Sequence, residues 1–348
     1  MWKLVVSLGL IVALAWRPIL TPAVIWAMTS QYDASIGTIP ILSQEQLTSV
    51  YANKSALILG GTKGIGFGIA LTLAKAGAHV TLVGRSETTG QGAIQKLKQH
   101  ALSPDQRIRY QKGDIGTVQS TLSLVETLKA SDIRYDFLIC SAGVFPDWTS
   151  LRNEDGLEKS YAIAVVGRFL IYRNMHHFLN LPNARVLNVL ASGMTIPMWI
   201  DREMVEGTKD PSTLFDAMFH FNTAHEVMLV GLDQRDANIK DAITRVSTHP
   251  GVIATELHQR QGPLTDASMY LMEVLLAIPE EECGIRQASI LASGTLPQGK
   301  LSYVDYFMMG RKQSGELQKQ VQLHLDWLWE TLIQLEQRAA SAARATSA

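Results

Sequence analysis

The sequence predicts an α/β fold, a doubly wound parallel sheet within a single domain, and three observations support this prediction. From residue 54 onward, short apolar runs of strand length alternate with longer helical stretches, as a parallel sheet with helical crossovers requires. The first apolar run, residues 56–59, is continuous rather than alternating, which is typical of a strand buried on both faces. A glycine-rich turn and then a helical stretch follow this run directly.

The composition fits one large folded domain with an extension at each end. The chain has 348 residues, of which 47% are hydrophobic, enough to form a sizeable core. Its formal net charge of −1 provides no basic field, so we expect no nucleic-acid partner. The two cysteines do not imply a disulfide framework, and we predict no metal site.

The N-terminal segment is a separate unit that admits three interpretations. Residues 4–16 and 19–28 are apolar, and Arg17 and Pro18 interrupt them. Residues 1–28 either anchor the protein in a membrane, with Arg17 snorkelling to the surface, or form a cleaved signal or targeting segment, or pack as an apolar helix on the domain. The anchor interpretation predicts a membrane-associated protein of the endoplasmic reticulum or another organelle.

The next segment, residues 29–53, is polar and irregular. We interpret it as a connector that contains a short helix at 43–51.

The glycine-rich turn after the first strand predicts a dinucleotide site of the Rossmann type. Its glycines fall where a strand has to bend sharply, pass close to a pyrophosphate and begin a helix whose first N–H groups face the anion. A second strand at 79–83 then closes the βαβ unit. The alternative is a tight strand-to-helix turn that holds no ligand. The cofactor-binding residues predicted in this turn are Gly60, Thr62, Lys63, Gly64, Ile65 and Gly66.

The spacing of these glycines, G-x-x-x-G-I-G, resembles that of the short-chain dehydrogenase/reductase family, although Leu59 stands where the family has Thr. A second segment adds to the resemblance. After a sixth predicted strand at 242–248, the chain continues as H-P-G-V-I-A-T, which is similar to the retinol-dehydrogenase-like branch of the family. The resemblance implies that Pro250 and Gly251 turn the chain under the nicotinamide and that the Thr255 hydroxyl binds its carboxamide.

The resemblance also sets the domain limits. It places a nucleotide-binding Rossmann domain at residues 54–312, closed by a seventh strand at 299–306. Residues 313–348 follow as a C-terminal helix and tail, with an apolar stripe along 317–338.

The end of the second strand predicts which dinucleotide is bound. Enzymes that use NAD commonly place an acidic residue there to bind the ribose 2′-OH, whereas an Arg accommodates the 2′-phosphate of NADP. Here Arg85 and Ser86 follow the strand and no acid is present. Arg85, together with Lys63, therefore predicts NADP as the cofactor. The alternative is that both are solvated surface cations.

Two further turns line the predicted adenosine side. A third strand at 107–111 leads into Asp114 and Ile115, and the resemblance implies that Asp114 binds the adenine edge with help from the backbone of Ile115. Asp114 could instead be the N-cap of the helix at 118–130. A fourth strand at 135–139 leads into Ala142 and Gly143, the half of the family's N-N-A-G motif that remains.

The predicted central helix, residues 157–179, is apolar on more than one face. The resemblance implies a homodimer or a larger complex that packs through this helix. Its sequence KSYAIAVVGRFLIYR is similar to the family's F-A-V-N-x-x-G-x-F pattern, and that register places Ala164 where the family has its Asn.

The catalytic residues of the family are only partly present. A fifth strand at 185–190 is followed by Ser192, which is a candidate for the substrate-polarising Ser and alternatively a turn hydroxyl bonded to its own backbone. In the family a Tyr and a Lys four residues later share a helix face, but the matching segment FHFNTAHEVML has Phe219 and Thr223 there. Phenylalanine cannot exchange a proton.

Two histidines lie beside these positions. Either His220 or His225 could act as a general acid or base, and the register that aligns Phe221 with the Tyr places His225 at the Lys position. The alternative is that both are structural.

Two hypotheses from different classes follow. The first is an NADP(H)-dependent oxidoreductase, with an altered or impaired catalytic tetrad, that acts on an alcohol or carbonyl of a small lipophilic substrate. The apolar N-terminus and the retinol-dehydrogenase-like segments favour it. The second is a pseudoenzyme, a non-catalytic scaffold or cofactor-sensing interaction protein, and the missing Tyr/Lys pair favours it.

Overall fold

The computed structural model describes residues 34–190, 198–236, 242–253, 266, 270, 273 and 277–347. The N-terminal segment 1–28, Ser192 and Thr255 lie outside the described residues. Within the described ranges, no helix combines the length and the apolar character that crossing a membrane requires.

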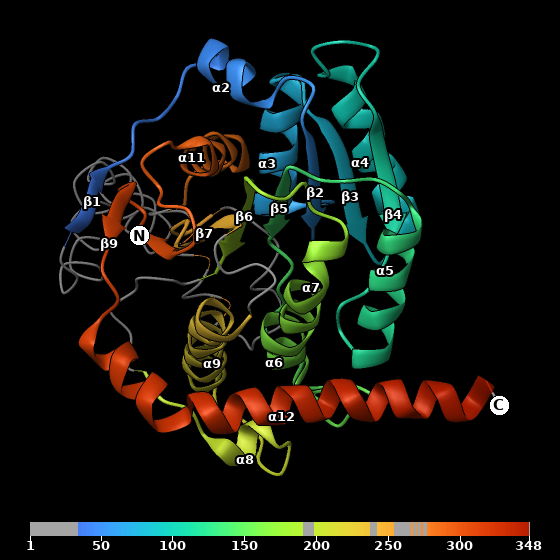
Figure 1. The fold of residues 1–348 in the computed structure, drawn as a ribbon, viewed down its shortest axis with the longest axis vertical. Helices are drawn as coiled ribbons and strands as arrows, with labels where there is room; N and C mark the ends of the chain where they lie inside the picture. The colour runs from blue at the N-terminus through green and yellow to red at the C-terminus, as the bar shows by residue number, and fades with distance from the viewer. Residues whose placement is uncertain are drawn as a thin grey trace, which may run out of the picture.

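The described part of the chain forms one nine-stranded sheet in the order β1-β9-β8-β7-β6-β5-β2-β3-β4 (Figure 1). The pairs from β8 to β4 are all parallel, whereas β9 is antiparallel to both of its neighbours. The strand order reverses between β2 and β5, so the crevice in which a doubly wound sheet binds ligands lies at their carboxyl ends. The strands are β1 Ala34–Thr38, β2 Ser55–Leu59, β3 His79–Gly84, β4 Ile108–Lys112, β5 Phe137–Cys140, β6 Ala184–Val189, β7 Ile243–Thr248, β8 Leu301–Val304 and β9 Met309–Arg311.

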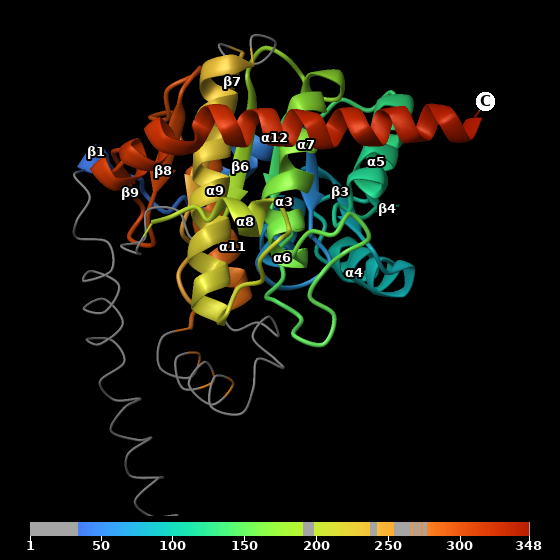
Figure 2. The ribbon, with the colours of Figure 1, turned by 90° about the horizontal axis from the view of Figure 1, so that it is seen from below.

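Helices cover both faces of the sheet (Figure 1). One face carries α2 Gln44–Tyr51, α3 Gly64–Lys75, α4 Glu87–Gln99 and α11 Glu280–Ala292. The other carries α5 Val118–Ala130, α6 Lys159–Tyr161, α7 Arg168–Asn174 and α9 Leu214–Arg235, with α8 Arg202–Val205 near one end of α9. The long helix α12, Gly315–Ser347, crosses the outer side of α9, α7 and α5 (Figure 2).

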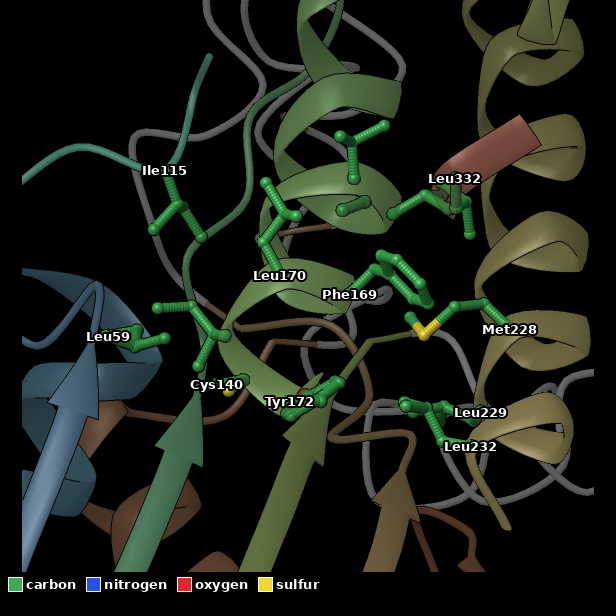
Figure 3. Packing of buried hydrophobic residues seen from close by; sticks show 14 of the residues in the cluster. Leu59, Ile115, Cys140, Phe169, Leu170, Tyr172, Met228, Leu229, Leu232 and Leu332 are labelled. Atoms are coloured by element: carbon green, nitrogen blue, oxygen red, sulfur yellow. The ribbon is translucent and has the colours of Figure 1, made fainter. Parts of the chain in front are cut away.

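The core consists mainly of two apolar clusters, one on each face of the sheet. Leu57 and Leu59 of β2 point into one cluster, and Ala56 and Ile58 point into the other. This alternation follows from the period of two in a strand, and it explains why β2 has to be apolar throughout. Figure 3 shows part of the first cluster, where Phe169 of α7 points toward Met228 of α9.

The seven predicted parallel strands are all present, with bounds that differ by at most two residues. The segment interpreted as an irregular connector contains the predicted short helix, α2, and also a strand that the sequence pattern missed, β1. β1 pairs with β9, which was also missed, from the other end of the domain. Tyr51 of α2 is fully buried, and its ring lies 4.9 Å from that of Phe137.

The predicted central helix is not continuous. After α6 it opens into a π-helical turn, Ala162–Gly167, which includes Ala164, and it then continues as α7. A π turn arises when one extra residue is accommodated in a helix, and such turns are frequent at functional sites. One face of α7 is covered by α12, where Phe169 and Trp329 meet edge to face at 5.3 Å. The surface expected to pack against a second copy is thus occupied in part by the chain's own C-terminal helix.

Helices α3 and α11 touch through their backbones. A Cβ on Gly68 would lie 2.1 Å from the carbonyl oxygen of Glu280, and a Cβ on Gly284 would lie 2.1 Å from the carbonyl oxygen of Gly68. Only glycine fits at either position without moving a helix. The close approach fixes α3, and with it the turn that precedes α3.

Candidate cofactor site

The glycine turn after β2 has the geometry of a dinucleotide cradle. Gly60 and Gly64 have φ angles of +78° and +58°, in the left-handed region that favours glycine. A Cβ on Gly66 would lie 2.3 Å from the carbonyl oxygen of Gly60, and a Cβ on Gly60 would lie 2.6 Å from the backbone of Ala142. The turn can take this shape only without side chains at these positions.

The N-terminus of α3 has no side-chain capping hydrogen bond from the described residues. Lys63 is the N-cap residue, has extended backbone angles and makes no side-chain capping bond. The first N–H groups of a helix lack intrahelical partners and attract anions together with the helix dipole. Thr62 holds the turn against the end of β3, where a Cβ on Gly84 would lie 2.9 Å from the Thr62 methyl. Ile65 is half-buried beneath the turn.

At the end of β3, Arg85 and Ser86 are both exposed. The Ser86 hydroxyl accepts a hydrogen bond from the Thr89 N–H at 3.3 Å and caps α4. Arg85 forms no ion pair with any residue in the described ranges. The guanidinium is therefore available to a ligand that lies over the end of this strand.

Asp114 lies beyond β4, in a turn rather than at a helix cap. Its Oδ1 accepts a hydrogen bond from the Gly116 N–H at 2.9 Å. The N-cap of α5 is Thr117, which forms a capping box with Ser120, so the alternative role of Asp114 as this N-cap is wrong. Ile115 is buried, and its carbonyl oxygen would lie 2.2 Å from a Cβ on Gly167.

Ala142 follows β5 and Pro250 follows β7, at the same edge of the sheet. Gly143 is exposed, and a Cβ there would meet nothing within 4 Å. Gly251 has a φ of +88°, and a Cβ there would meet the ring of Tyr306 at 2.3 Å. The structure thus brings together at this edge all the predicted cofactor residues that it describes.

Phe219 and Thr223 lie on α9, where the sequence places the family's proton donor and its lysine. Phe219 packs edge to face against Trp199 with ring centroids 5.3 Å apart. Thr223 is fully buried, and its hydroxyl donates to the Phe219 carbonyl oxygen at 2.7 Å. Neither side chain can act as a general acid at neutral pH.

His220 lies on α9 and is buried on the side that faces α6. Burial lowers its pKa to about 4, its Nδ1 accepts from the Asp201 N–H at 3.3 Å, and its ring stacks on Tyr161 at 5.7 Å. His225 is completely buried, and burial also lowers its pKa. Both rings are therefore neutral at neutral pH, and neither carries a ready proton there.

One buried residue at this edge was missed by reasoning from the sequence. Arg168, at the start of α7, is only 1% exposed. Its Nη2 donates to the carbonyl oxygens of Ala142 at 2.8 Å, just after β5, and of Val189 at 3.1 Å, the last residue of β6. The signal available was a single cation inside the run AIAVVGRFLIY, where an exposed helix face would show several polar residues.

Comparisons with known proteins agree with this architecture. A family model described as short chain dehydrogenase matches residues 54–199. The chain is 24% identical over 199 residues to a WW domain-containing oxidoreductase of Drosophila melanogaster, covering 57% of this chain and 48% of that protein. It is 27% identical over 212 residues to retinol dehydrogenase 13 of Mus musculus, covering 60% and 61%. It is 28% identical over 119 residues to polyprenol dehydrogenase of Homo sapiens, covering 34% and 35%. The chain spans about half the length of the curated relatives it matches.

Solved structures share the fold. The MalC reductase/Diels-Alderase from Malbranchea aurantiaca superposes with a TM-score of 0.56 at 17% identity, covering 76% of this chain and 98% of that one. An RhlG/NADP active-site complex from Pseudomonas aeruginosa superposes with a TM-score of 0.52 at 18% identity, covering 74% and 97%. At these identities the likeness is one of fold alone.

Proposed function

Because the Rossmann domain of this chain belongs to the short-chain dehydrogenase/reductase family, we propose that the protein binds NADP(H) and acts on an alcohol or carbonyl group of a small lipophilic substrate. The cradle formed by Gly60, Gly66 and the uncapped N-terminus of α3 carries the proposal. A Cβ at either glycine would collide with the backbone that shapes the turn, and the first N–H groups of the helix suit a pyrophosphate. The residues present fit the cofactor.

The choice of NADP over NAD rests on Arg85. The guanidinium is exposed at the carboxyl end of β3, where the 2′ position of the adenosine ribose falls in a doubly wound sheet. An arginine fork binds phosphate through paired charged hydrogen bonds. Asp114, next along this edge, would bind the adenine.

The substrate class rests on two relatives and on the N-terminal segment. Two relatives are named for retinol and polyprenol, and a small apolar substrate agrees with the apolar N-terminal segment, which we propose as a membrane anchor. When bound, NADPH supplies a hydride. This chain's own residues would then orient the substrate oxygen, with Ser192 as the proposed hydrogen-bond donor. Since His220 and His225 are neutral near pH 7 and Phe219 has no proton to give, we propose that water supplies the proton and that turnover is slow.

A second function is favoured by one observation. Thr223 is fully buried and bonds only to its own helix, so nothing at this position can replace the ammonium of the family's lysine. A protein that binds NADP(H) and responds to it without turnover would keep the cradle and lose this residue. In that case the protein serves as a cofactor-sensing scaffold.

Two measurements on the full-length protein test these proposals. Calorimetric titration with NADPH and NADH checks binding, and we expect NADPH to bind more tightly by tenfold or more. A screen of hydride transfer from NADPH to retinal-like and shorter apolar aldehydes then separates the two functions. Equal affinity for both dinucleotides contradicts the cofactor assignment, and tight NADPH binding without any turnover favours the scaffold.

A further inference from the structure

Arg168 is a buried cation that has no carboxylate partner in the described part of the chain. Its side chain is 1% exposed, and no ion pair of Arg168 occurs within the described ranges. Two backbone carbonyls occupy its Nη2, while Nε and Nη1 have no hydrogen-bond partner among the described residues. A buried guanidinium with two idle donor groups is costly unless something else accepts from it.

The buried carboxylate of Glu226 forms no ion pair with Arg168 within the described ranges. Glu226 of α9 is 3% exposed, and its Oε1 accepts from the Ser247 hydroxyl at 3.3 Å and lies 3.9 Å from His225 Nδ1. The other titratable groups near Arg168 are uncharged at neutral pH. Burial raises the pKa of Cys140 to about 11 and that of Tyr172 well above its ordinary value, and it lowers the pKa of His225.

The position of Arg168 points to what accepts from it. Its Nη2 joins the carbonyl of Ala142, which borders the cradle at Gly60, to that of Val189 at the end of β6. A dinucleotide in a doubly wound sheet lies across the switch point with its pyrophosphate on the first helix. Arg85 marks the adenosine half at the end of β3, so the nicotinamide half falls on the opposite side, toward β5 and β6.

We propose that Arg168 binds the nicotinamide riboside half of the cofactor through its idle Nε and Nη1 groups. An arginine has donors only, and this half of the cofactor offers acceptors in its ribose hydroxyls and carboxamide oxygen. Arg168 would then supply from α7 the fixed cation that α9 lacks at Thr223. This inference rests on the proposed binding of NADP(H).

One helical turn after Arg168, Tyr172 anchors α7 to β6. Tyr172 lies on α7 four residues after Arg168, and its hydroxyl donates to Oδ1 of Asn188 on β6. The Tyr172 ring is buried in the same apolar cluster as Cys140 (Figure 3). Tyr172 thereby links the face of α7 that carries Arg168 to β6, the strand whose last residue Arg168 contacts. A cation held in this way loses little entropy on binding.

Binding measurements with two probes test the proposal. NADPH contains both halves of the cofactor, whereas adenosine 2′,5′-bisphosphate lacks the nicotinamide riboside. We expect Arg168→Met to weaken NADPH at least tenfold and to leave the affinity for adenosine 2′,5′-bisphosphate within twofold of wild type. Arg168→Lys should recover part of the loss. The matched control is Arg173→Met on the same helix, whose side chain lies over Phe169 and Trp329 away from the cradle; it should change neither affinity.

A measurement on the unaltered protein covers the case in which Arg168→Met does not fold. A fixed positive charge beside the ring repels the oxidised, cationic nicotinamide, so the wild-type protein should bind NADPH several-fold more tightly than NADP⁺. An NADP⁺ affinity equal to or greater than that for NADPH overturns the proposal. An Arg168→Met variant whose affinities for both probes fall equally also overturns the proposal, because Arg168 would then only support the structure of the cradle. If the wild-type protein binds neither adenosine 2′,5′-bisphosphate nor NADPH, the proposed function itself fails, and this inference fails with it.

Discussion

The backbone of Ala142 runs directly against Gly60, so that a Cβ on Gly60 would lie 2.6 Å from both N and Cα of Ala142. Gly60 follows β2 and Ala142 follows β5, which are neighbouring strands at the switch point of the sheet. Their contact sets the width of the crevice in which we expect the pyrophosphate to lie.

We therefore expect Gly60→Ala to abolish dinucleotide binding. The methyl group would have to displace the Ala142 backbone, and the φ of +78° strains any side chain. Calorimetry with NADPH and a thermal melt check the result. Gly92→Ala is the matched control, since a Cβ there meets nothing within 4 Å, and it should leave binding intact and raise the melting temperature slightly. Tight binding by Gly60→Ala would contradict the cradle.

Arg85→Ala should reduce the preference for NADPH over NADH by tenfold or more. A charged hydrogen bond of this kind contributes about 1.5–3 kcal/mol, and the NADH affinity should stay nearly constant. The two affinities are compared by titration. Arg107→Ala serves as the control, because Arg107 is exposed just before β4, at the amino end of that strand. A preference that survives Arg85→Ala places the 2′-phosphate elsewhere.

Stability should fall between pH 7 and pH 5 because of two buried histidines. Burial lowers the pKa of His220 and of His249 to about 4 from 6.5, so the unfolded chain binds more protons than the folded one in that window. The stability from each neutral ring is complete above pH 6.5 and is lost as the pH falls toward 4. The loss amounts to about 2 kcal/mol per ring at pH 5. Urea unfolding at both pH values should show a smaller loss for His249→Gln than for wild type. The exposed control His100→Gln should match wild type, and an equal loss in His249→Gln would contradict the assignment.

Phe219→Tyr combined with Thr223→Lys should raise NADPH-dependent reduction of small aldehydes above the wild-type rate. The pair restores a proton donor and the cation that lowers its pKa, and a general acid is typically worth about 10²–10⁴-fold. Steady-state absorbance of NADPH measures the change. The control is Phe215→Tyr with Thr223→Lys, since Phe215 lies one turn earlier on α9 and is 56% exposed. Equal rates in the two double variants would show that Phe219 does not stand at the position of the family's Tyr.

The N-terminal prediction concerns residues outside the described ranges. Removing residues 1–28 should release the protein from membranes into the soluble fraction while NADPH binding is kept. Fractionation of cells that express either form measures this. A full-length protein that is already soluble with its N-terminus intact would contradict the anchor.

The sequence was sufficient for the parts of the fold whose signal is local. A continuous apolar run predicts β2, and three glycines in its turn predict the cradle, because both depend on residues that are adjacent in the chain. β1 and β9 were missed because both are short, and because they pair with each other from opposite ends of the domain. Their stability comes from that pairing rather than from local propensity.

The same distinction separates the site residues that were predicted from those that were missed. Asp114 precedes a helix and was given the cap as an alternative role, yet Thr117 takes it because its hydroxyl reaches the N–H of Ser120. Arg168 was missed because its partners, Ala142 and Val189, come from two strands that only the folded sheet brings to α7. No local sequence pattern predicts a contact between residues that are this far apart in the chain.

The glycine contact between α3 and α11 has a consequence for the order of events during synthesis. Gly68 lies near the start of the domain, and Gly284 emerges from the ribosome only after most of the sheet has been made. Until then α3, whose N-terminal N–H groups we expect to bind the dinucleotide, lacks its backbone contact with α11. We expect nascent chains that end before α11 to capture no NADPH, even though the whole glycine turn is already present. Cofactor capture thus marks completion of the domain.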